Sequence, residues 1–255
     1  MGNGRSIGKQ VGKIREEANA QISKITAEDA DGAVLASKID AVTTDIFRRH
    51  ISEREAFRVQ QALSGAAEMC RRLFEDNQTL RSDAFFDPTA GRDGSSEIVE
   101  GILLAAQRQW EEKKVRHLGY ALANIAFHEE IDMRTAAYVI YTAEQLSWMQ
   151  LISLAIVATN EDSPLPEKRV GEHNSTEWDA WTAHRELNDL LTKWELIGSE
   201  PKKTPNLGLS VPNMNIADFR LRAGGFLIYE LLNLSEVPDS ERMPVRDALS
   251  IERSA

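Results

Sequence analysis

Apolar residues recur at the spacing of an α-helix along most of the chain, and they are densest from Val115 to Ala158. In this stretch Gly119 and Ala123 lie four residues apart, where small side chains allow a second helix to approach closely. A neighbouring face carries apolar side chains at intervals of three, four and three residues, at Val115, Leu118, Leu122 and Ile125. The pattern predicts that residues 115–158 form a helical core.

Capping signals divide this core into three predicted helices. The polar run 128–132 interrupts the apolar pattern, and Asp132 is a suitable N-cap for a second helix. Ser147 can cap a third helix that ends at Ala158. From Leu146 to Ala158 thirteen residues carry no charge, which is too few to cross about 30 Å of hydrocarbon. We therefore expect a buried helix and no membrane span.

The N-terminal part also has helical spacing. Apolar positions indicate amphipathic helices over residues 11–25 and 31–50. Ser52 and Glu55 have the spacing of a capping box, which predicts a third helix after residue 52. Residues 1–76 are therefore predicted to be a region of N-terminal amphipathic helices.

The central region, 77–158, is predicted to begin with a loop over 77–96, because Pro, Gly, Asp and Ser are frequent there. Ser96 is a suitable N-cap for the next helix. We expect that helix to continue through the charged residues 111–116, exposed to solvent, into the core.

The C-terminal part has the element order of a winged-helix-like module over residues 176–234. The turn-rich residues 201–215 predict at most a short β-hairpin, and a last helix is predicted over about 216–232, unless Gly224–Gly225 mark a turn before it. Residues 235–255 are polar and are predicted to be a flexible tail. One helix face before the hairpin is predicted to be packed, with Trp178, Trp181, His184, Leu187, Leu190, Leu191 and Trp194.

These elements predict an all-α fold: a multi-helix bundle with a small C-terminal winged-helix-like module. The net charge is −10, although residues 1–26 carry +3. An acidic body disfavours nucleic acid as a partner, because such binding depends on neutralising phosphates. Cys70, the single cysteine, lies on an apolar stripe and is expected to be buried. No secretory signal precedes the first predicted helix, so we expect a cytoplasmic protein.

The sequence also resembles a known family. The segment 186–199, ELNDLLTKWELIGS, and the segment 221–234, LRAGGFLIYELLNL, are similar to the end of bacterial proteins related to the abortive-infection protein Abi-alpha. In that family an LxxLxxxGLI helix end precedes an LTxxGxxL segment. Here Trp194-Glu195 stands where Gly is usual, and Arg222 replaces the Thr. The resemblance covers about residues 110–234 and implies a helical protein of phage-defence or regulatory type, without an active-site residue.

One polar cluster is a candidate metal or acid–base site. The run HEEID at 128–132 does not have the HExxH spacing that places two zinc ligands on one helix face. His117 and His128 are eleven residues apart, which corresponds to about 16 Å along a continuous helix. No single metal bridges that distance, so a solvated turn is the preferred interpretation. The cluster consists of His117, His128, Glu129, Glu130 and Asp132.

A second candidate site would bind nucleic acid through the C-terminal module. In a winged helix, basic residues at the wing and beside the last helix could contact phosphates. These residues are Lys202, Lys203, Arg220 and Arg222. Packing or dimerisation of the module is the alternative that the acidic body favours.

The sequence contains no phosphate-binding loop and no nucleophile elbow. We therefore expect no catalytic residue, metal or cofactor, and the main hypothesis is a non-enzymatic cytoplasmic interaction or regulatory protein, with a protein partner or self-association. A nucleic-acid-binding regulator and a metal-dependent enzyme at 117–132 are the alternatives.

Overall fold

The structure is a computed structural model, and it describes residues 13, 16, 20, 30–49, 51–83, 85, 94–170, 177–199 and 214–251. Most of the helix predicted over 11–25 and of the turn-rich segment 201–215 lies outside these residues. The chain divides into two compact units, residues 1–145 and 146–255. The division falls inside the range 77–158, which the apolar pattern presents as one core.

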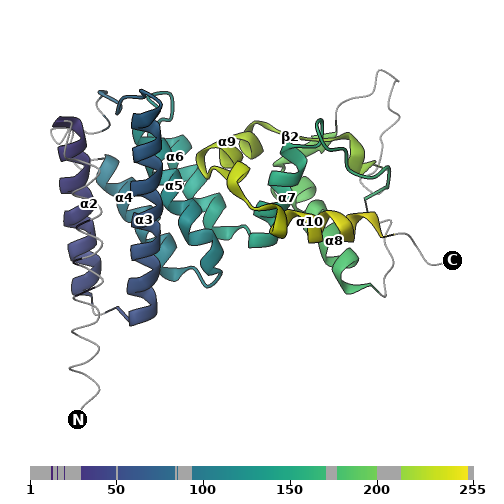
Figure 1. The fold of residues 1–255 in the computed structure, drawn as a ribbon, viewed down its shortest axis with the longest axis horizontal. Coiled ribbons are helices and arrows are strands. Elements are labelled where there is room, and N and C mark those ends of the chain that lie inside the picture. Colours follow the sequence, from purple (N-terminus) through teal and green to yellow (C-terminus); the bar gives the residue numbers. More distant parts are fainter. Residues whose placement is uncertain are drawn as a thin grey trace, which may run out of the picture. The chain divides into compact units, whose positions relative to one another are not determined.

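Unit 1 is a bundle of helices in which α5 (Glu112–Phe127) lies beside α3, as Figure 1 shows. Between Val115 and Phe127 every residue of α5 except Arg116 is buried. This helix packs mainly against α3 and also contacts α4 and α6. The bounds of the remaining helices of the unit are Ala30–Arg48 for α2, Glu53–Glu75 for α3, Gly94–Arg108 for α4 and Met133–Gln145 for α6.

Three predicted caps are confirmed, whereas the predicted cap at Ser96 is wrong, because α4 begins at Gly94 and includes Ser96. The Ser52 hydroxyl accepts the backbone N–H of Glu55, whose carboxylate accepts the Ser52 N–H at 2.7 Å, so the capping box starts α3. Asp132 accepts the backbone N–H of Thr135 at 2.7 Å and caps α6. Ser147 caps α7 in unit 2. Each cap supplies an acceptor to a backbone N–H that has no partner within its own helix.

Small residues bring α3 and α5 into close contact, as the spacing of Gly119 and Ala123 predicts. A Cβ atom on Gly119 would lie 2.0 Å from the carbonyl oxygen of Ala62. A Cβ atom on Gly65 of α3 would lie 2.6 Å from the carbonyl oxygen of Arg116. The two backbones therefore meet where neither helix has room for a side chain.

The prediction that one helix runs through 111–116 is wrong. The chain breaks between α4 and α5, and the side chain of Gln109 accepts the backbone N–H of Glu111 at 3.3 Å. This break allows both helices to pack against α3. Lys114, expected to be exposed, has a side chain that is only 1% exposed, and its Nζ donates to the carbonyl oxygen of Glu144 at 3.2 Å.

Unit 2 is built around α7 (Trp148–Ala158), whose residues from Gln150 to Val157 are all buried. This helix contacts α8 (Trp178–Thr192), α9 (Ala223–Leu231) and α10 (Asp239–Ser250). Unit 2 also contains two short 3-10 helices, Ile216–Asp218 as η4 and Leu234–Glu236 as η5.

A two-stranded antiparallel sheet joins β1 (Ile197–Ser199) to β2 (Phe219–Leu221), with Gly198 opposite Arg220. The predicted mostly helical fold with at most a short β-hairpin is therefore confirmed for the described residues. The helix predicted over 216–232 is shorter than expected. It is α9, which begins at Ala223 after η4 and β2 and has Gly224–Gly225 in its first turn. The winged-helix-like identity of 176–234 stays a prediction.

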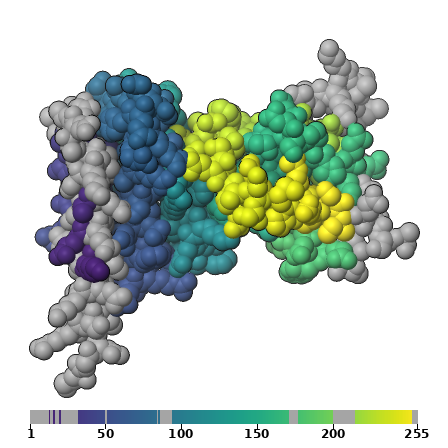
Figure 2. All heavy atoms as spheres, viewed as in Figure 1, coloured from purple at the N-terminus to yellow at the C-terminus, as the bar shows by residue number. Residues whose placement is uncertain are grey.

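The prediction of a flexible tail over 235–255 is wrong for its described part. Figure 2 shows α10 as a yellow band on the surface of unit 2. Its apolar residues Val245 and Leu249 are buried, and the Nζ of Lys168 donates to the carbonyl oxygen of Ser250 at 2.7 Å. Pro244 lies inside this helix, which explains why the polar, proline-containing sequence did not indicate one. Among the described residues, no helix has both the length and the apolar content needed to cross a membrane.

Candidate interaction surface

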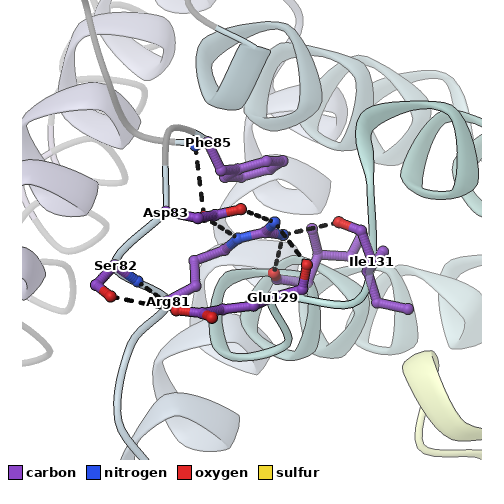
Figure 3. A network of polar contacts seen from close by, with 7 residues as sticks. Arg81, Ser82, Asp83, Phe85, Glu129 and Ile131 are labelled. Atoms are coloured by element: carbon purple, nitrogen blue, oxygen red, sulfur yellow. Dashed lines mark hydrogen bonds and ion pairs between the residues drawn. The ribbon is translucent and has the colours of Figure 1, made fainter.

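The connection between α5 and α6 is held by a buried arginine, Arg81, in the polar network of Figure 3. Its guanidinium pairs with both carboxylate oxygens of Asp83, Nε to Oδ1 at 2.7 Å and Nη2 to Oδ2 at 2.6 Å. It also donates to the carbonyl oxygens of Ile131 at 2.8 Å and Glu129 at 3.2 Å, and it lies 4.0 Å from the ring centre of Phe85. These hydrogen bonds from Arg81 hold the pKa of Asp83 below its usual value. The network ties the segment after α3 to the turn after α5.

The predicted polar cluster is part of this structural arrangement. A ring nitrogen of His128 lies 2.7 Å from the carbonyl oxygen of Asn124. Glu129 accepts the backbone N–H of Ser82 at 3.0 Å, and Glu130 is exposed. Within the described residues, no group of three or more His, Cys, Asp and Glu side chains could hold a metal ion.

The other two members of the cluster have separate surroundings. His117 is buried in the middle of unit 1, where its ring meets the ring of Tyr120 edge-on at 5.5 Å. Asp132 caps α6, and the N–H of Thr135 lowers the pKa of its carboxyl. His117 and Asp132 therefore each contact their own neighbours, and both have a structural role.

The candidate phosphate contacts that the structure describes are paired with carboxylates. Arg220 Nε lies 3.1 Å from Glu161, and its Nη1 donates to the carbonyl oxygen of Phe219 at 2.9 Å. Arg222 Nη1 lies 3.6 Å from Glu195. Lys202 and Lys203 lie outside the described residues. A phosphate would therefore have to compete with an acidic neighbour for each of the two arginines.

A different surface stands out on α8. Trp178 is 72% exposed, so most of its large apolar side chain faces solvent. Its ring stacks on that of Trp181, with ring centres 5.0 Å apart and planes 27° apart. The guanidinium of Arg185 lies 5.2 Å from the centre of the Trp181 ring. We call Trp178, Trp181 and Arg185 the aromatic ladder.

The prediction that Trp178 shares a packed face with Leu187 is wrong. A helix turns by about 100° per residue, so two residues nine positions apart point in opposite directions. Ala180, Ala183, Leu187 and Leu190 are buried, and this phase places Trp178 on the exposed side. The opposite directions of Trp178 and Leu187 were predictable from the sequence, because the angle between them about the helix axis follows from their residue numbers alone.

The surroundings of the ladder are polar at one end. Glu177 and Asp179 flank Trp178, and both are exposed. Arg185 is exposed at the other end of the ladder. Glu186 instead lies near α7, with its carboxylate 3.5 Å from the hydroxyl of Ser147, and burial raises its pKa. Asp189 lies one turn after Arg185, in line with Trp178 at about 100° per residue. The ladder is thus an aromatic strip with two carboxylates beside Trp178 and an arginine, followed by a carboxylate, at the other end.

Comparison of the chain with family models, with curated proteins and with solved structures finds no match. The geometry of the chain itself therefore provides the functional argument. In the described part of the chain, the aromatic ladder is the feature whose composition best fits a binding surface, since Trp and Arg are enriched among the residues that dominate protein interfaces.

Proposed function

We propose that the chain is a non-enzymatic, cytoplasmic interaction or regulatory protein, and that the aromatic ladder is its surface for a protein partner. The exposure of Trp178, stacked on Trp181, is the observation that carries the proposal. Single exposed apolar residues are ordinary, but two stacked tryptophans with an adjacent arginine form a contiguous strip.

Covering the exposed tryptophan with a partner would be energetically favourable. Burying a tryptophan removes roughly 150–250 Å² from water, and apolar burial contributes about 25 cal/mol per Å². With 72% of Trp178 still exposed, covering it would contribute on the order of 3–4 kcal/mol before the costs of association. The stacking of Trp181 and Arg185 on each other orders these side chains in advance, which reduces the entropy lost on binding.

The further proposal of a phage-defence type rests on the sequence resemblance alone, and two backbone positions within the resembling segments have a local structural reason. Glu195, where the resembling proteins have glycine, has a φ of 53°, which glycine adopts at least cost. At the second glycine of the resemblance, a Cβ on Gly225 would lie 2.1 Å from the carbonyl oxygen of Leu196. A residue without a Cβ is therefore favoured at the end of α8 and required at the start of α9.

Proximity labelling in the source cells tests the partner proposal. We expect partners recovered with the wild-type chain to be lost with the double variant Trp178→Ala and Trp181→Ala. Trp110→Ala is the matched control, because Trp110 is 76% exposed but lies in unit 1. Identical partners for all three proteins would reject the ladder as the surface for a partner other than the chain itself.

Phage plating tests the regulatory class separately. We expect cells that express the chain to lower the plating efficiency of at least one phage, and we expect the double variant to lose this effect. Equal plating across a broad phage panel, with and without the chain, would contradict the defence proposal. The identity of the neighbouring genes provides an independent check.

A further inference from the structure

We propose that the partner of the aromatic ladder is the ladder of a second copy of this chain, with the two α8 helices antiparallel across a two-fold axis. The inference rests on the proposed function, because it requires the ladder to be an interaction surface. It adds the identity of the partner and the geometry of the contact.

Antiparallel pairing makes the ladder complementary to itself. A two-fold contact presents the same patch from both copies. If the axis passes between Trp181 and Thr182, then Trp178 of one copy faces Arg185 of the other, and this contact occurs twice. Each pair lies about 5 Å from the axis, at a rise of 1.5 Å per residue. Trp181 and Thr182 face each other at the centre, where the larger side chain meets the smaller one.

The charges select this orientation. Each Arg185 would lie over the Trp178 ring of the other copy, between the carboxylates of Glu177 and Asp179. All four side chains are exposed in the single chain. A guanidinium combines favourably with both an aromatic face and a carboxylate. A parallel pairing would instead place like charges together at both ends, which is unfavourable. The position of Arg185 opposite Glu177 and Asp179 of the other copy therefore favours an antiparallel pairing over a parallel one.

The predicted dimer is weak. Stable interfaces bury about 1,200–2,000 Å² in total, and one pair of ladders covers less than that. We therefore expect association in the micromolar range, which depends on protein concentration. Arg185 already lies over Trp181 within its own helix, so the guanidinium is held close to the position that the contact requires.

Sedimentation analysis of the full chain, from about 1 to 200 µM, tests the proposal by the usual dependence of a weak dimer on concentration. We expect the average mass of the wild-type protein to rise from 28.5 kDa toward twice this value. Arg185→Glu should weaken the association at least about tenfold, and so should the double variant Glu177→Lys and Asp179→Lys. In each variant, residue 185 of one copy has the same charge as residues 177 and 179 of the other copy, which it faces. Circular dichroism confirms that the variants fold.

Mixing is the decisive measurement. A mixture of the Arg185→Glu protein with the Glu177→Lys, Asp179→Lys protein restores opposite charges at both ends of the contact, so we expect it to form a heterodimer. A monomeric wild-type chain at every concentration, or a mixture that does not associate, would overturn the proposal. If the chain is monomeric while Trp178→Ala with Trp181→Ala still loses labelled partners, only the second-copy inference fails and the proposed function stands.

Discussion

Replacing Gly119 by alanine should destabilise unit 1, because the added methyl group has no room. The new Cβ would lie 2.0 Å from the carbonyl oxygen of Ala62 and 2.9 Å from the backbone nitrogen of Ala66. Both are backbone atoms of α3, so the clash cannot be relieved by a side-chain rotation. The two helices must move apart, which weakens the packing along α3 and α5.

The magnitude follows from two opposing effects. Forcing extra volume into a packed core costs about 1–3 kcal/mol, and a rigid backbone contact belongs at the upper end. Alanine in place of glycine in a helix gains about 1 kcal/mol. We therefore expect the free energy of unfolding to fall by about 2 kcal/mol, which is roughly 6–8 °C in melting temperature for a unit of this size.

Gly101→Ala is the matched control, since it introduces the same methyl group into α4 of the same unit. The nearest atoms to its new Cβ belong to the Ile140 side chain at 3.9 Å, an ordinary contact distance. We expect this variant to be more stable than the wild type by about 0.5–1 kcal/mol.

Urea unfolding of the full chain, followed by far-UV circular dichroism, measures both variants. Gly119→Ala should lower the midpoint of the unit 1 transition without changing its slope, and Gly101→Ala should raise it. A Gly119→Ala protein as stable as the wild type, or an equal loss of stability in both variants, would show that the contact between α3 and α5 leaves room for a methyl group.

Three further predictions concern single side chains. Burial lowers the pKa of Lys114 from 10.5 to about 8, so the unfolded chain binds more protons between these values and stability should rise with pH there. Lys114→Met should remove this rise and stabilise unit 1 below pH 8 by up to about 3 kcal/mol; parallel urea midpoints for both proteins from pH 7 to 9.5 would contradict it. Glu195→Gly should raise the free energy of unfolding of unit 2 by about 1 kcal/mol, seen as a higher melting temperature, because it relieves a φ of 53° and loses only an exposed ion pair with Arg222. Burial raises the pKa of Cys70 to about 12, so its thiol should not react with a thiol reagent at pH 8 until urea unfolds the chain; rapid reaction of the native protein would show that it is accessible.

Features that depend on neighbours in the sequence were predictable. The Ser52 and Ser147 caps and the Asp132 cap each involve residues three positions apart, so a short motif contains all the atoms that form the contact. The burial of Cys70 followed from its position on an apolar stripe. The closeness of another helix to Gly119 also followed from spacing, but which helix approaches it did not.

The buried polar groups were decided by contacts between distant parts of the chain. Lys114 was expected in solvent because its neighbours in sequence are charged, yet it reaches a carbonyl oxygen of α6, thirty residues away. Arg81 binds carbonyl oxygens 48 and 50 residues further along the chain. No periodicity in one segment reports an acceptor that another segment supplies.

The aromatic ladder also depends partly on local sequence geometry and partly on tertiary packing. The sequence by itself determined the helical class, the caps and the rotation of Trp178 relative to Leu187, because all three depend on backbone geometry over one or a few turns. Only the tertiary structure decided which side of α8 is covered, since α7 and α10 pack against this helix. It also decided that the apolar positions of α10 have a core to join, because a short polar helix is not stable until tertiary packing buries one of its faces.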